Sequence, residues 1–328
     1  MSVREISYLQ ALNEALHEEM ARDLDVFIMG EDIGLGKGTL GVTEGLRDEF
    51  GPERVRNTPI SEQALVGSAL GAALTGCRPI VELMFIDLLG VCMDQVANQV
   101  AKVAYMSGGK ARPSLVIRTQ EGVGLGLAAQ HSQSLEAWLV HVPGLVVVAP
   151  STPFDAKGLL KTAIRDDNPV FFIEHKLLYT AKGPVPEDEY LVPLGVADIK
   201  RKGKNVTIVA TSHQVQHALA AATTLAQEGI EAEVVDPRTL NPLDVETIAE
   251  SVRRTHRLVV VNEGCRTGSY ASEVAATLGE HVFEYLDAPI MRVAAKDAPI
   301  PANLQLEREV VPKPKDIVDM VHKMMGAS

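Results

Sequence analysis

Aromatic side chains, cysteine and long apolar runs are all scarce in this chain of 328 residues. Aromatic residues make up 4% of it, with a single Trp, so aliphatic side chains must fill its cores. Cys77, Cys92 and Cys265 are odd in number and widely spaced, which suggests neither a disulfide framework nor a metal site. No apolar stretch approaches the length of a transmembrane helix, and the N-terminus lacks the apolar run of a signal peptide. We therefore expect a cytoplasmic location and no membrane partner.

An excess of positive charge is also missing. Lys and Arg number 31 against 43 Asp and Glu, which gives a net charge of -12 and argues against nucleic acid as a partner. The motifs H-E-x-x-H, G-x-S-x-G and G-x-x-x-x-G-K-[ST] do not occur, so zinc peptidases, serine hydrolases and P-loop enzymes lack their residues here.

Hydrophobic residues, by contrast, make up 46% of the chain. Unalternated apolar runs of strand length alternate with segments of helical periodicity, which predicts an α/β fold with a doubly wound parallel sheet. The expected strands of the first half are residues 26–30, 78–85, 113–119, 145–149 and 170–174. Expected helices include residues 5–22, 87–106, 153–165 and 314–325, and an edge strand is expected at 284–293.

The length favours two domains. A polar, proline-bearing stretch at 182–192 has the composition of a linker. We therefore predict one domain over residues 1–185 and a second α/β domain over residues 194–328. Ligands of such sheets bind beyond the carboxyl ends of the strands, so polar residues that follow strands are the site candidates.

The segment 57–76 holds the main candidate, Glu62. Ser61 can cap a helix, and Glu62 falls in the first turn of that helix, ahead of small and apolar residues. Burial disfavours a charged carboxylate whereas a helix N-terminus favours it, and a carboxylate under both influences suits proton transfer. The alternative is that Glu62 merely complements the helix dipole.

A glycine-rich loop offers a different interpretation. Gly36, Gly38 and Gly41 form a G-x-G-x-x-G pattern after a strand, with an acidic residue about twenty positions further on, as in nicotinamide-dependent dehydrogenases. Against this, Glu31 and Asp32 would set two negative charges beside a pyrophosphate, and the strand does not lead into the glycines by a tight turn. A flexible surface loop is the other interpretation.

His131 lies in A-A-Q-H-S-Q, on a second loop rich in glycine. A loop histidine is a candidate for catalysis, although surface or structural histidines are common. For His175 and His213 we favour structural roles. Asp87 follows a strand and is a neighbour of Glu62 by inference only.

Several stretches stand in order across nearly the whole chain. They include T-P-I-S-E-Q, V-E-L-M-F, D-Q-V-A-N-Q-V-A-K, Y-M-S-G-G-K, A-A-Q-H-S-Q-S and V-D-P-R-T-L-N-P-L-D. Together they resemble the β subunit of thiamine-diphosphate-dependent 2-oxo acid dehydrogenases, the pyruvate, branched-chain and acetoin group. The resemblance implies an oxidoreductase whose first domain binds the cofactor pyrimidine and whose second is a transketolase-type C-terminal domain.

By position, the resemblance implies that Glu62 contacts the pyrimidine N1′ and shares a proton there. Met84 and Leu88 would contact the cofactor, and Leu88 stands where relatives often carry an aromatic ring. His131 would lie on the substrate side, where it stabilises charge on the adduct or assists acyl transfer to lipoyl groups.

The resemblance also implies a monovalent cation site, usually potassium, made chiefly of backbone carbonyls. The matching positions are Leu115, Ala163, Ile164, Asp166 and Asn168, of which Asp166 carries the one formal charge. The alternative is an ordinary helix end and turn, for which D-D-N-P is well suited.

The G-D-G…N signature that holds magnesium and diphosphate is absent from the sequence. The resemblance therefore implies an α subunit that supplies the diphosphate half of the site, in an α2β2 tetramer docked to a dihydrolipoyl acyltransferase core. Glu284 and Asp287 are a candidate docking surface, although such residues usually just solvate a face. Acetoin is the first expected substrate, then pyruvate, then branched-chain oxo acids. Two alternatives stay open: a nicotinamide-dependent dehydrogenase and a non-catalytic assembly subunit.

Overall fold

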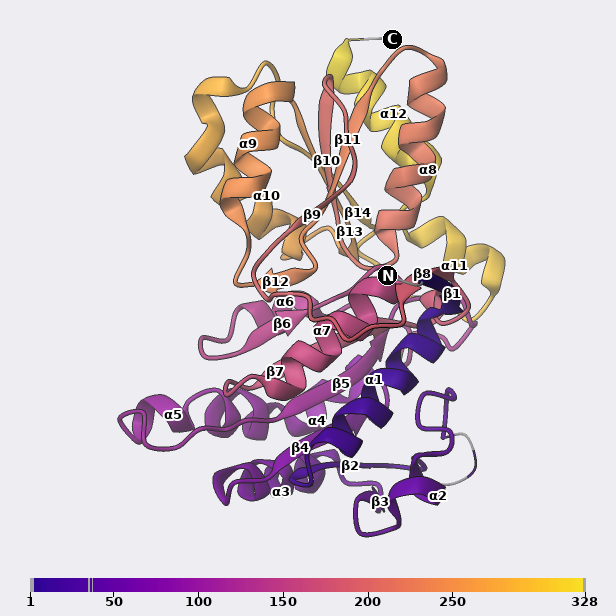
Figure 1. The fold of residues 1–328 in the computed structure, drawn as a ribbon. Coiled ribbons are helices and arrows are strands. Elements are labelled where there is room, and N and C mark those ends of the chain that lie inside the picture. The colour runs from indigo at the N-terminus through magenta and orange to yellow at the C-terminus, as the bar shows by residue number, and fades with distance from the viewer. Residues whose placement is uncertain (1–2, 35, 37, 327–328) are drawn as a thin grey trace. The chain divides into compact units, whose positions relative to one another are not determined.

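The computed structural model describes residues 3–34, 36 and 38–326 (Figure 1). The chain forms two compact units. Unit 1 comprises Met1–Glu121 and Trp138–Leu194, and unit 2 comprises Gly122–Ala137 and Gly195–Ser328. The division predicted from the sequence leaves residues 122–137 in the first domain, whereas the structure groups them with unit 2.

Unit 1 is built on a parallel sheet in which the strands run in the order β6-β7-β5-β4-β2-β3. These strands are β2 (Val26–Gly30), β3 (Val55–Asn57), β4 (Arg78–Leu83), β5 (Val116–Glu121), β6 (Val146–Val148) and β7 (Val170–His175). The parallel α/β architecture expected from the unalternated apolar runs is therefore confirmed.

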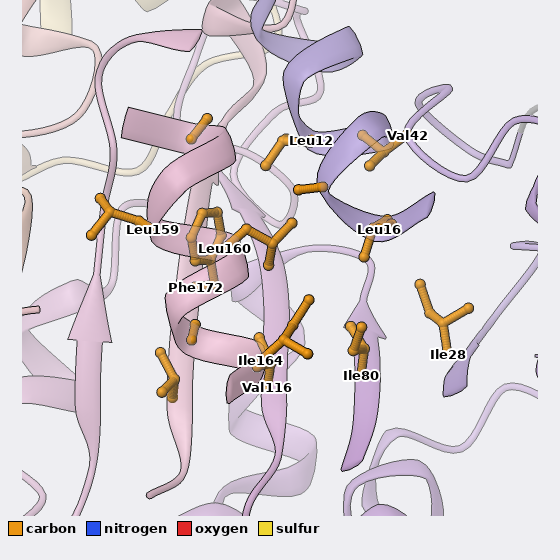
Figure 2. Packing of buried hydrophobic residues seen from close by; sticks show 14 of the residues in the cluster. Leu12, Leu16, Ile28, Val42, Ile80, Val116, Leu159, Leu160, Ile164 and Phe172 are labelled. Atoms are coloured by element: carbon orange, nitrogen blue, oxygen red, sulfur yellow. The ribbon is translucent and has the colours of Figure 1, made fainter. Parts of the chain in front are cut away.

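Two helices cover one face of this sheet. α1 (Tyr8–Arg22) and α7 (Pro153–Arg165) pack against each other over the strands. Figure 2 shows their leucines above the strand residues, in one cluster that includes Leu12, Leu16, Leu159, Leu160, Ile28, Ile80, Val116 and Phe172. Burial of such side chains contributes about 1.5–3 kcal/mol each, so this layer is a main source of stability for unit 1.

Buried charge lies further along the same strands. Arg118 is fully buried and donates from Nε and Nη2 to Glu174, at 2.7 and 2.9 Å, and from Nη1 to Glu82 at 2.8 Å. The hydroxyl of Tyr179 also donates to Glu174, at 2.7 Å. Burial raises the pKa of Glu82, although Arg118 opposes the shift. These charges tie together three neighbouring strands, β4, β5 and β7.

Some expected elements of unit 1 are wrong in their bounds. The expected helix at 5–22 is instead strand β1 (Val3–Ser7) followed by α1, because the Ser7 hydroxyl accepts from the Gln10 backbone and caps the helix. β1 pairs antiparallel with β8 (Lys182–Pro186), so part of the expected linker is a strand. The helix expected at 87–106 is broken into η1 (Ile86–Leu88), α4 (Leu89–Asp94), the π-helical η2 (Gln95–Val100) and α5 (Val103–Met106).

Unit 2 has a sheet of order β14-β13-β10-β11-β9, parallel except for β9. Its strands are β9 (Asp198–Arg201), β10 (Val206–Ala210), β11 (Ala232–Asp236), β13 (Leu258–Cys265) and β14 (Met291–Ala295). α8 (Gln214–Gln227) and α12 (Pro314–Met325) pack on one side, and α9 (Val245–Thr255) and α10 (Tyr270–Val282) on the other (Figure 1). The expected edge strand at 284–293 begins only at Met291, because η4 (Phe283–Tyr285) precedes it.

The remaining elements are α2 (Leu46–Phe50), α3 (Glu62–Leu74), α6 (Glu136–Val140), η3 (Lys176–Leu178), β12 (Thr239–Asn241) and α11 (Leu304–Val310). Across the described residues, none of the helices has the length and apolar character needed to cross a bilayer.

Candidate active site

Glu62 is the first residue of α3 and is 8% exposed. Ser61 occupies the N-cap position as predicted, but its side chain makes no capping hydrogen bond. The helix follows β3, which pairs in parallel with β2. Glu62 is therefore buried at the carboxyl edge of the unit 1 sheet, where ligands of such sheets bind.

A second carboxyl group stands beside Glu62. Glu31 directly follows β2, and its Oε1 is buried without a hydrogen-bond partner. Burial, and then the charge of Glu62, raise the pKa of Glu31, while a hydrogen bond from the Ser61 backbone opposes the shift. Asp32 follows at φ 56°, in the left-handed region, where strain often accompanies a functional site. From the sequence alone Glu31 counts only as an objection to pyrophosphate binding, although its place at a strand end is a signal that could have identified it as a site residue.

Other groups around this edge are also polar and buried. The Thr58 backbone donates to the Gly30 carbonyl at 2.9 Å, while the Thr58 hydroxyl is buried without a partner. The Cys92 thiol is buried, and burial together with nearby Glu62 raises its pKa to about 12, so it stays neutral. Glu31 Oε1 and Thr58 Oγ1 are thus two oxygens that a polar ring could satisfy, which fits a pyrimidine at this place.

Two predicted cofactor contacts share this edge. Met84 directly follows β4, the other neighbour of β2, and Leu88 ends η1; both are half-buried. The structure therefore brings Glu62, Met84 and Leu88 to the carboxyl ends of neighbouring strands in unit 1.

His131 belongs to unit 2, within residues 122–137, and is half-buried. Its loop is closed by a hydrogen bond from the Gly122 backbone to the Gln133 carbonyl, at 3.0 Å. His175 accepts from the Leu177 backbone at 3.1 Å and caps η3, while His213 packs edge-on against His217 with ring centroids 4.6 Å apart. Structural roles for His175 and His213 stay predictions.

Four of the five predicted cation ligands, Ala163, Ile164, Asp166 and Asn168, lie at the end of α7. The fifth, Leu115, directly precedes β5, and its carbonyl accepts from the Val170 backbone at 3.0 Å. The carboxylate of Asp166 accepts from the backbone and side chain of Asn168, at 2.7 and 2.9 Å. The guanidinium of Arg78 donates to the carbonyls of Ile164 and Asp166, at 3.1 and 2.9 Å. Neutral carbonyls with one carboxylate suit a monovalent cation chemically, but such an ion would share two of these carbonyls with a cationic side chain.

The glycine loop of the alternative interpretation lacks the required helix. Gly36, Gly38 and Gly41 all have positive φ, and residues 38–45 form turns and bends until α2 begins at Leu46. Leu35 and Lys37 lie outside the described residues. A dinucleotide motif needs a helix N-terminus at its last glycine, so this loop does not favour a nicotinamide cofactor.

Comparison with known proteins covers both units. Residues 4–182 match the family described as transketolase, pyrimidine binding domain, and residues 195–317 match transketolase, C-terminal domain. The chain is 48% identical to the β subunit of acetoin:2,6-dichlorophenolindophenol oxidoreductase of Bacillus subtilis, over 98% of each chain. It is 45% identical to the pyruvate dehydrogenase E1 component subunit β of Porphyra purpurea, over 97% of this chain and 96% of that one. A solved split-gene transketolase, described as an inactive β4 tetramer, superposes with a TM-score of 0.80 at 26% identity, covering 98% of this chain and 99% of the other.

Proposed function

We propose, from the premise that this chain belongs to the family of acetoin and pyruvate dehydrogenase E1 β subunits, that it supplies the pyrimidine half of a shared active site. The family consists of oxidoreductase subunits and implies the use of thiamine diphosphate. The proposal depends chiefly on one observation. Glu62 is a buried carboxylate at the carboxyl edge of the sheet, where two buried oxygens have no hydrogen-bond partner.

Thiamine diphosphate, when bound, supplies the carbanion chemistry that no protein side chain can perform. Glu62 exchanges a proton with the pyrimidine N1′, and its burial keeps water from competing for that proton. The raised pKa of Glu31 favours its neutral form, which lowers the repulsion between two neighbouring carboxyl groups. Met84 and Leu88 contribute apolar contacts to the cofactor, without the aromatic ring that relatives often have.

His131 acts on the substrate side in this proposal. Its imidazole stabilises negative charge or assists transfer of the acyl group to a lipoyl group. Acetoin is the proposed first substrate, with pyruvate second and branched-chain oxo acids third. The identity of 48% to an acetoin relative, against 45% to a pyruvate relative, supports placing acetoin before pyruvate.

The proposed partner subunits are inferred from a motif that is absent from the sequence. Without a G-D-G…N signature, the chain needs an α subunit that holds magnesium and the diphosphate, and we propose an α2β2 tetramer bound to an acyltransferase core. Glu284 and Asp287 are exposed carboxylates of unit 2 and stay candidates for docking a basic segment. Potassium at the end of α7 and the cytoplasmic location also stay predictions.

The test is to produce this chain alone and together with its α subunit. Reduction of dichlorophenolindophenol is then measured with acetoin, pyruvate and a branched-chain oxo acid, with thiamine diphosphate and magnesium present. We expect activity only from the complex, highest with acetoin. Full activity of the isolated chain would contradict the shared site, and tight NADH binding would favour the dehydrogenase alternative.

A further inference from the structure

We infer that Asn262, Glu263 and Gly264, at the carboxyl end of β13, position the loop that carries His131. The loop comprises residues 122–137 and is called the His131 loop below. The inference rests on the proposed function in so far as it gives His131 a part in the reaction. The three residues are positioning residues, because they act on the loop and not on the reacting atoms.

Glu263 holds the start of the loop. It lies in β13 and is 7% exposed, and its Oε1 accepts a hydrogen bond from the Val123 backbone at 2.9 Å. Its Oε2 accepts from Nε2 of Gln214 at 3.0 Å, in the first turn of α8. A hydrogen bond from a backbone amide to a buried carboxylate is stronger than one between neutral groups. The loop entry is therefore fixed to two elements of unit 2.

Asn262 and Gly264 hold the end of the loop. Nδ2 of Asn262 donates to Glu136, and Asn262 is 1% exposed. A Cβ at Gly264 would lie 3.3 Å from the Ser134 carbonyl oxygen, closer than ordinary van der Waals contact. The absence of a side chain at position 264 therefore lets the loop backbone approach β13.

The loop is closed on itself between these two attachments. The Gly122 backbone donates to the Gln133 carbonyl at 3.0 Å, so both ends of the segment with His131 meet. Val123 is buried in a small cluster with Ala295, Ile300 and Val311, which adds apolar contact at the entry. His131 is thus carried on a closed loop whose two ends both attach to one tripeptide of β13.

Gln214 connects Glu263 to a second histidine, His217. Its Oε1 lies 3.2 Å from Nδ1 of His217, which also lies 3.1 Å from the Pro312 carbonyl. Both partners of this nitrogen are acceptors, so it carries a proton, and the Gln214 amide is oriented with Nε2 toward Glu263. Glu263 therefore needs to be an acceptor on both oxygens.

The test uses Glu263→Gln in the complex with the α subunit. The new amide can still accept from Val123, but its nitrogen then faces the donor of Gln214. Hydrogen exchange at peptides covering residues 122–133 should accelerate at least tenfold. The kcat should fall by up to about 100-fold with little change in KM, as expected when a catalytic group is displaced by about 1 Å.

Rescue and control variants separate positioning from general damage. Adding Gln214→Glu to Glu263→Gln restores a donor and acceptor pair and should recover the exchange protection and most of the kcat. Glu233→Gln is the matched control, because Glu233 is also a buried strand glutamate of unit 2, accepting from Arg254 and the Gly203 backbone. It should leave exchange in the His131 loop unchanged.

Combining Glu263→Gln with His131→Ala separates the attachment of the loop from the role of His131 in the reaction. In that background Glu263→Gln should lower kcat no further. Unchanged exchange of the loop in Glu263→Gln would overturn the inference. Faster exchange with unchanged kcat would support the attachment and overturn the role of His131. If Glu263→Gln does not fold, Asn262→Ala provides the same readouts at the other attachment.

Discussion

Replacing Arg118 by Met should destabilise unit 1 by about 3–5 kcal/mol. The guanidinium makes three hydrogen bonds to Glu82 and Glu174, and all three side chains are buried. Met fills similar space, so the loss comes from leaving two carboxylates in the sheet without a counter-charge. At roughly 2–4 °C per kcal/mol for a unit of this size, the melting temperature should fall by about 6–20 °C.

The loss in Arg118→Met should also depend on pH. The pKa of Glu82 is already raised by burial, and without the arginine it rises further. A carboxyl group with a raised pKa in the folded state contributes stability below its unfolded pKa and loses it as pH rises through the folded pKa. The deficit of the variant should therefore be larger at pH 8 than at pH 5.

Urea unfolding followed by circular dichroism, at both pH values, measures the effect. The triple variant Arg118→Met, Glu82→Gln, Glu174→Gln is the control, because it removes the buried charges together and should recover at least half of the loss. If Arg118→Met lowers the free energy of unfolding by less than about 1 kcal/mol, Glu82 and Glu174 do not need Arg118 as a counter-charge, because breaking a buried ion pair costs several times more.

Three further predictions concern single positions. Glu31→Gln should raise the melting temperature at pH 8 and lose this gain below pH 4, because the pKa of Glu31 is raised in the folded chain; a thermal scan against pH checks it. Gly144→Ala should cost on the order of 3 kcal/mol in urea unfolding, because φ is +103° and the new Cβ would overlap the Ala101 carbonyl. Potassium should raise the melting temperature of the chain more than lithium does at equal ionic strength, and Asp166→Asn should reduce that difference; equal effects of both ions would count against the site.

The sequence predicted the bounds of helices well where a single local signal marked where the helix begins. α7 and α12 have the expected bounds, because a proline in the first turn marks the start of each helix. The helix expected at 5–22 was predicted to begin too early, because its Leu and Ala spacing gives a helical period that can be extended back to residue 5. In the structure Ser7 is the N-cap, so the helix begins at Tyr8. The break in 87–106 follows from a π-helical turn, which leaves no mark in an apolar pattern.

The candidate site was predicted in part. The order of the quoted motifs along the chain identified the family, and the comparisons confirm it. The place of Glu31 at a strand end could have identified it from the sequence, but its proximity to Glu62 depends on the parallel pairing of β2 with β3, which no local pattern shows. The attachment of the His131 loop to Glu263 spans 140 positions, and such a pairing has no local signature.

The most direct test of the account is the rate at which the C2 proton of bound thiamine diphosphate exchanges with deuterium in the complex. Replacing Glu62 by Gln removes the proton acceptor at N1′ without changing the shape of the side chain. We predict that exchange slows by at least about 100-fold while the cofactor still binds and the complex stays intact. An unchanged exchange rate with cofactor bound would contradict the role of Glu62.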